Sequence, residues 1–143
     1  MAVEAKQPLI DASIEIDGVD LSQVANEVDI DDSASEEDVS GFQGGGYTEE
    51  ARGLKTAVIN ITFFQDYSTG SVHQTLKPLY DSGETFVVKV KPDDAPASED
   101  NPQSVMTGRL FGYSPIKAQV GKAQAIQVTI RNASSDGLTE VTS

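Results

Sequence analysis

The residues that most often carry catalysis are sparse in this chain and do not form a known catalytic motif. His73 is the sole histidine of the 143 residues, and there is no cysteine. A histidine base or ligand needs partner groups, and the serines lack the Gly-x-Ser-x-Gly turn of a nucleophile elbow. The acid pairs Glu36-Glu37 and Asp93-Asp94 stand in polar segments without the apolar surroundings of a general acid–base pair. We therefore interpret His73 as a solvated surface residue and predict that the chain is not an enzyme.

Two short segments resemble ion-binding or phosphate-binding loops but fail at the positions that matter. Asp29-Ile30-Asp31-Asp32 begins like a calcium loop, yet Ala34 and Ser40 stand where that loop needs Gly and Glu. Gly44-Gly45-Gly46 lacks the Lys-Ser/Thr of a phosphate-binding loop and does not join a strand to a helix. The sequence therefore predicts no bound metal and no cofactor.

The negative charge is concentrated in the first third of the chain. Residues 1–50 carry 14 acids and one lysine, whereas residues 51–143 carry nine acids and nine bases, which together give the net charge of -13. Such asymmetry indicates an acidic arm beside a conventional folded body. It argues against ordinary nucleic-acid binding, which needs clustered Lys and Arg to replace phosphate counterions.

No targeting or membrane segment is predicted. The N-terminal residues lack a basic start followed by an apolar run, and no apolar stretch approaches the roughly 20 residues of a membrane helix. We expect the protein to stay in a cytoplasm or to leave it inside a larger particle.

The elements that position these residues are mostly strands. Alternation of apolar and polar residues predicts strands over residues 13–17, 23–31, 55–64, 84–91, 104–113 and 123–131, with a tight turn at Asp17-Gly18. The expected core combines the inward residues of these strands with one helical stripe. It comprises Ile59, Ile61, Phe63, Leu76, Leu79, Phe86, Val88, Val90, Ile126, Val128 and Ile130.

One helix is expected over about residues 71–81. Ser71 and Gln74 have the spacing of a capping box, Val72, Leu76 and Leu79 share one helical stripe, and Gly83 follows the last turn.

Residues 32–54 are predicted to be a long, mobile, acidic and Gly-rich loop, because few apolar residues offset the entropy of ordering them. We hypothesise that this loop orders against a neighbouring subunit. Its candidate interface residues are Glu36, Glu37, Asp38, Phe42, Gly44, Gly45, Gly46 and Tyr47.

The expected fold is mainly β, a small β-sandwich or half-open barrel with one α-helix. An N-terminal arm (residues 1–12) precedes a β domain (residues 13–131) that contains the inserted assembly loop 32–54. A polar and loose C-terminal tail (residues 132–143) follows.

Several segments resemble the tail tube proteins (major tail proteins) of long-tailed siphophages. Residues 53–67 (GLKTAVINITFFQDY) resemble their long strand, and residues 70–80 (GSVHQTLKPLY) resemble their single helix. Residues 86–92 (FVVKVKP) with Asn101-Pro102 are similar to the hairpin that follows, and residues 106–116 (MTGRLFGYSPI) to the next strand and turn. The resemblance covers roughly residues 13–140.

The resemblance implies a structural virion protein, assembled in the host cytoplasm, that forms stacked hexameric rings. The resulting tube conducts DNA during ejection without binding it. Its partners would be further copies of itself and the tape measure, terminator and distal tail proteins. We expect a negative lumen, for which the candidate acids are Glu84, Asp93, Asp94, Glu99 and Asp100. The alternatives are a capsid decoration protein, a terminator or baseplate component, and a soluble ligand-binding β domain.

Overall fold

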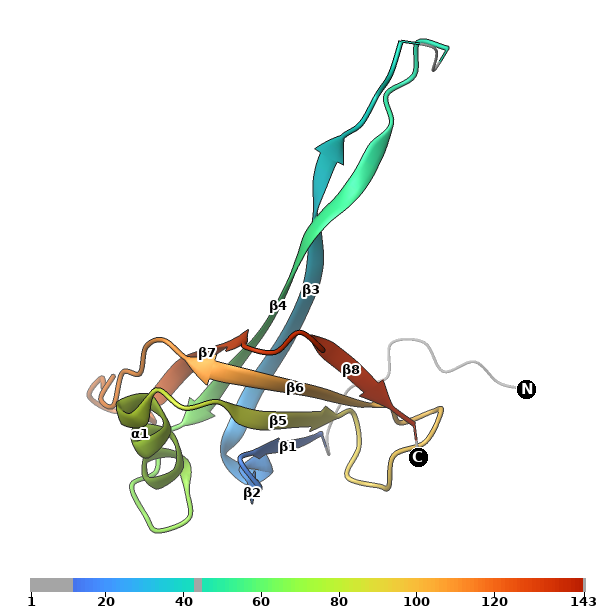
Figure 1. The fold of residues 1–143 in the computed structure, drawn as a ribbon. Coiled ribbons are helices and arrows are strands. Elements are labelled where there is room, and N and C mark those ends of the chain that lie inside the picture. The colour runs from blue at the N-terminus through green and yellow to red at the C-terminus, as the bar shows by residue number, and fades with distance from the viewer. Residues whose placement is uncertain (1–11, 43–44, 143) are drawn as a thin grey trace.

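The alternating segments form one antiparallel sheet with a single helix (Figure 1). The computed structural model describes residues 12–42 and 45–142. Within them the strands are β1 (Ser13–Ile16), β2 (Val19–Asp20), β3 (Ala25–Asp38), β4 (Glu50–Phe64), β5 (Phe86–Lys91), β6 (Gln103–Leu110), β7 (Ala125–Asn132) and β8 (Leu138–Val141). The helices are a 3-10 turn, η1 (Ser22–Val24), and α1 (Val72–Ser82).

The sheet is curled but does not close into a barrel, so the half-open form of the predicted fold is the one observed. The strand order is β2-β1-β5-β6-β7-β4-β3, and β8 pairs with β6 off this path. The first half of β6 pairs with β8 and its last residues pair with β7, so β7 and β8 occupy successive stretches of β6.

The core lies inside the curl of the sheet and is covered by α1. All of the predicted core side chains are buried except Leu79, which is half-buried against the same cluster. Ile59, Ile61 and Phe63 of β4 are fully buried, as expected from their alternation. Burial of each such side chain contributes roughly 1.5–3 kcal/mol. Val72 and Leu76 hold α1 against the sheet.

Two turns confirm the sequence prediction and one cap does not. Asp17 and Gly18 both have positive φ (51° and 81°) and join Ile16 directly to its partner Val19, which is the form of a two-residue hairpin. Gly83 ends α1 in the left-handed conformation and donates its N–H to the Leu79 carbonyl. Ser71 is the N-cap residue, but its side chain makes no capping hydrogen bond, so the predicted capping box is wrong.

The predicted boundaries of the long loop were wrong. Residues 32–38 belong to β3 and residues 50–54 belong to β4, so the connection spans only residues 39–49. Residues 138–141 of the predicted loose tail form β8 on β6. The predicted N-terminal arm, except for Ala12, and Gly44 lie outside the described residues.

A β-bulge near the start of β3 explains the irregular alternation of that strand. Ala25 pairs with Phe63 and Glu27 pairs with Thr62, so Asn26 is the extra residue. The bulge turns Asn26 and Glu27 to the same side, and Val28 and Ile30 then resume contact with the core.

Candidate assembly surfaces

The far halves of β3 and β4 form a two-stranded ribbon that projects from the body (Figure 1). β7 pairs with β4 only from Val58 to Phe64, so residues 50–57 of β4 have β3 as their one neighbour in the described sheet. We call residues 31–56 the ribbon. None of its described side chains is buried. The ribbon therefore adds almost no apolar burial to the body.

The ribbon is acidic along its length. It carries seven acids and two bases. Glu36 faces Arg52 across the strands, whereas Asp38 faces Glu50, a like-charge pair that is unfavourable. Hydrogen bonds from the Ser40 side chain and backbone amide lower the pKa of Asp38, so it stays ionised. The pairing of β3 with β4 shifts register a second time between Ala34 and Glu36. A Cβ at position 53 would collide there with the Ser35 side chain, which explains why this position is a glycine.

The end of the ribbon presents four of the predicted interface residues, Phe42, Gly45, Gly46 and Tyr47, to solvent. Phe42 is fully exposed and Tyr47 is 81% exposed. Gly45 and Gly46 both have positive φ (73° and 84°), which fits a turn that side chains with a Cβ rarely adopt. The base of this turn is closed by hydrogen bonds from the Val39 amide to the Glu49 carbonyl (2.9 Å) and from the Glu49 amide to Ser40 Oγ (2.7 Å).

A second exposed apolar surface lies on the loop between β6 and β7, residues 111–124. Phe111 and Ile116 are 65% and 69% exposed, and Val120 is fully exposed. The loop has no helix or strand of its own. Structureless loops of this length in compact domains are usually either functional or disordered.

Side-chain hydrogen bonds hold this β6–β7 loop in place. Gln65 Nε2 donates to Tyr113 Oη (2.9 Å) and to the Pro115 carbonyl (2.7 Å). Tyr67 Oη donates to the same carbonyl (2.8 Å). Tyr113 Oη lies 2.9 Å from His73 Nδ1. Burial raises the pKa of Tyr113, so the phenol remains a protonated donor at neutral pH.

His73 is thus a half-buried member of this network rather than the solvated residue that we predicted. Its ring also lies 5.1 Å from that of Tyr67, centroid to centroid. No sequence pattern marks this role, because the partners of His73 come from distant segments. Its contacts are those of a structural histidine.

The five predicted lumenal acids do not form one cluster. Asp93, Asp94, Glu99 and Asp100 are exposed on the loop between β5 and β6, whereas Glu84 precedes the opposite end of β5.

Asn101, which the sequence did not single out, orders the acidic β5–β6 loop. Its side chain is buried, accepts from the Asp93 amide (3.0 Å) and donates to the carbonyls of Asp93 (3.0 Å) and Ala95 (2.8 Å). A sequence pattern cannot distinguish this asparagine from a solvated one in a polar loop.

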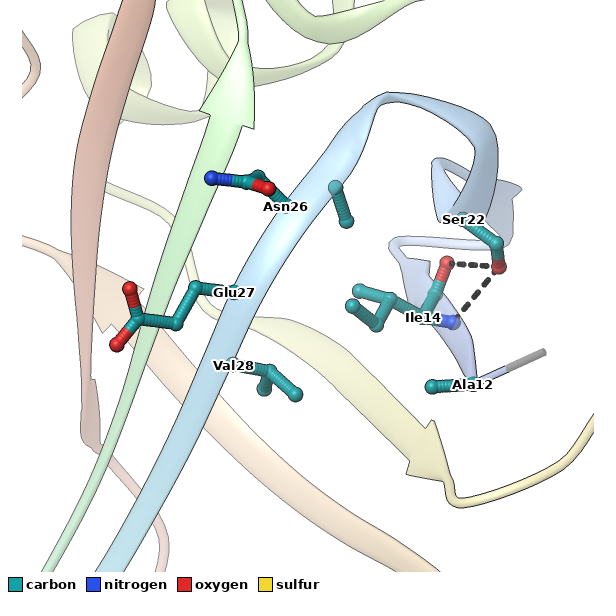
Figure 2. A pocket seen from close by; sticks show the side chains of 7 residues that line it. Ala12, Ile14, Ser22, Asn26, Glu27 and Val28 are labelled. Carbon is teal, nitrogen blue, oxygen red and sulfur yellow. Dashed lines mark hydrogen bonds between the residues drawn. The ribbon is translucent and has the colours of Figure 1, made fainter. Parts of the chain in front are cut away.

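A cavity of about 330 Å³ marks the seam where β1 and β3 approach without pairing (Figure 2). Ala12, Ile14 and Val28 line it, and Figure 2 shows that Glu27 points away from Ile14. Ser22 Oγ accepts from the Ile14 amide (2.8 Å) and so occupies the backbone edge of β1. Among the described residues that line the seam, Glu27 is the one with an ionisable side chain, and it does not point at Ile14.

Within residues 12–42 and 45–142, no group of three or more His, Asp or Glu side chains is placed to hold a metal ion. No helix of the described chain is long and apolar enough to cross a membrane.

Comparison with family models and with curated proteins finds no match. Solved structures do match in fold. A chain in the tail of an empty gene transfer agent particle, whose structure has C6 symmetry, superposes with a TM-score of 0.65 over 82% of each chain at 13% identity. A chain in the virion of a native gene transfer agent particle has a TM-score of 0.71 at 14% identity, and the match covers 92% of this chain and 95% of that chain. The protein therefore shares its fold with chains of gene transfer agent particles.

Proposed function

We propose that this protein is a non-enzymatic structural subunit of a phage-like particle that self-assembles into the tail tube. Six copies form a ring, and rings stack into a tube through which DNA passes during ejection. The protein is assembled in the host cytoplasm and ends in the tail of the virion. Its other partners are the tape measure, terminator and distal tail proteins.

The observation that carries this proposal is the projecting acidic ribbon. A two-stranded hairpin without a packed face is at best marginally stable in water. None of the ribbon's described side chains is buried, and Phe42 and Tyr47 stand exposed at its end. Exposed aromatic side chains of this kind are common anchors of protein interfaces. The ribbon therefore fits a contact with a neighbouring subunit, made by Phe42, Tyr47, the glycine turn and the acids Glu36, Glu37 and Asp38.

The fold matches support a structural protein of a particle tail. One matched chain belongs to a particle tail with C6 symmetry, which is the ring symmetry proposed for this protein. A capsid decoration protein, a terminator or baseplate component could share the fold without forming a long polymer. A soluble ligand-binding domain would need polar groups that converge on a cavity, whereas Figure 2 shows Asn26 and Glu27 at the seam pointing away from Ile14.

The acids of the β5–β6 loop are proposed to face the lumen, together with Glu84. Lys and Arg contacts to phosphate would retard DNA, whereas a negative wall repels it. The alternative is that these acids serve only solubility. Changing Asp93, Asp94, Glu99 and Asp100 to Lys should leave tubes intact and slow DNA ejection. Ejection at the normal rate would favour the solubility explanation.

Electron microscopy of the purified protein tests the proposal directly. At rising protein concentration we expect hexameric rings and tubes in negative stain, and light scattering should report a mass far above 15.2 kDa. A monomer at all concentrations that binds mature capsids would instead establish a decoration protein.

A further inference from the structure

The segment that contains β6, the β6–β7 loop and β7 has an unusual charge composition. Residues 101–135 contain four bases and no acid in a chain whose net charge is -13. The four bases, all exposed, are Arg109, Lys117, Lys122 and Arg131. The segment is therefore locally basic within an acidic protein, with Arg109 and Arg131 on the sheet and Lys117 and Lys122 in the loop.

Two of these bases are placed unfavourably for the isolated subunit. Arg109 and Arg131 are direct cross-strand partners in the β6–β7 pairing. Like charges in this position repel each other. Arg131 pairs with Val58 of β4, and Val58 pairs with Asp31 of β3. Asp31 therefore lies two strands away from Arg131, at about 10 Å. Among the described residues the one ion pair joins Lys77 and Asp81. This arginine pair thus favours an anionic partner from outside the subunit.

The same surface is apolar at the β6–β7 loop and fixed in shape. Phe111, Ile116 and Val120 expose their side chains there. The bonds from Gln65 and Tyr67 to the Pro115 carbonyl tie the loop to the body. A surface that is ordered before binding loses less entropy when a partner docks.

We propose that the β6–β7 loop, with Arg109 and Arg131, is the docking surface for the acidic ribbon of a second copy of this chain. The proposal rests on the proposed self-assembly and names the two surfaces that meet. The ribbon carries five net negative charges and exposed apolar residues, and the loop surface carries four positive charges and exposed apolar residues. The ribbon points away from the body that bears the loop, so the contact joins different copies (Figure 1).

Disulfide trapping tests the contact, because the chain has no native cysteine. Two single variants, Phe42→Cys and Val120→Cys, are mixed, assembled and oxidised. We expect the mixed disulfide dimer to exceed either homodimer at least tenfold and to be absent under conditions that keep the protein monomeric. Ser98→Cys is the matched control, since Ser98 is exposed on the β5–β6 loop, which precedes β6, whereas the β6–β7 loop follows it.

Charge reversal tests the same contact without a crosslink. Glu36→Lys with Glu37→Lys should slow assembly at least tenfold. Adding Lys117→Glu with Lys122→Glu in the same chain should restore most of the rate. Asp136→Lys with Glu140→Lys has the same charge change on another exposed surface and should alter the rate less than twofold. Circular dichroism melting confirms that each variant is folded.

The outcomes separate this proposal from the proposed function. If tubes form but Phe42→Cys crosslinks equally to Ser98→Cys, or the second charge reversal gives no rescue, the docking surface is wrong and the tube function stands. If the unaltered protein never polymerises, the proposed function fails and the docking surface fails with it.

Discussion

Excision of the ribbon should leave the body folded and abolish assembly. The change replaces residues 34–55 by Asn-Gly, which joins Ser33 to its cross-strand partner Thr56. The chain already uses the same kind of two-residue turn at Asp17-Gly18. No described side chain that is removed is buried, so little apolar burial is lost.

The expected effect on stability is small and favourable. Shortening the closed segment about elevenfold lowers the entropy cost of closure by up to about 2 kcal/mol. The free energy of unfolding should therefore stay constant or rise by that amount, and Tm should rise by no more than about 8 °C. Ile61→Ala is the contrasting control, since Ile61 is fully buried and its truncation should cost about 2–5 kcal/mol.

Thermal melting and size-exclusion chromatography with light scattering measure the two effects. The expected result is a stable monomer that gives no rings or tubes. A variant that melts well below the unaltered protein would mean that the ribbon is part of the folded core. A variant that still forms tubes of normal length would mean that the ribbon is not the assembly element.

Three further predictions concern the body and the assembly conditions. Asn101→Ala should lower the free energy of unfolding by about 1–3 kcal/mol, because the Asp93 amide and the carbonyls of Asp93 and Ala95 lose their hydrogen-bond partner. A melting temperature equal to that of the unaltered protein would contradict this. Tyr113 has a raised pKa in the folded state, so its contribution to stability is complete below about pH 10 and is lost as the pH rises through the folded value. Chemical denaturation between pH 8 and pH 11 should then show a loss of stability that Tyr113→Phe lacks. Assembly followed by light scattering should slow as salt rises, because screening limits charge attraction to about 8 Å near physiological ionic strength. A rate that is indifferent to salt would show that apolar contacts alone drive stacking.

The sequence predicted the body of the fold well because that body buries one side of each strand. Ile59, Ile61 and Phe63 alternate with polar residues, and this pattern is the direct result of a core on one face only. The helix was located for the same reason, since Val72 and Leu76 face the sheet.

The strands of the ribbon and β8 were not predicted, because they lack the alternation of apolar and polar residues that one buried face produces. Residues 32–38 are solvated on both faces, and small and acidic residues have low strand propensity. β8 forms because β6 leaves part of one edge unpaired, and that edge is a property of the tertiary fold. The candidate surfaces were found in part. Phe42 and Tyr47 stood out in a polar segment, whereas the network around Tyr113 joins residues far apart in sequence.

The long free edge of β3 has a consequence for the symmetry of any assembly. Within the described chain β3 pairs only with β4, and seven of its 14 residues are acidic. An unpaired strand edge is ordinarily a template for a second identical edge. Two β3 edges related by a two-fold axis would set one acidic row against another, and that repulsion opposes a closed dimer. Copies are left with contacts between unlike surfaces, which repeat from one subunit to the next and generate rings or filaments with a direction. In the proposed tube, the acids of β3 would therefore set a direction along the polymer.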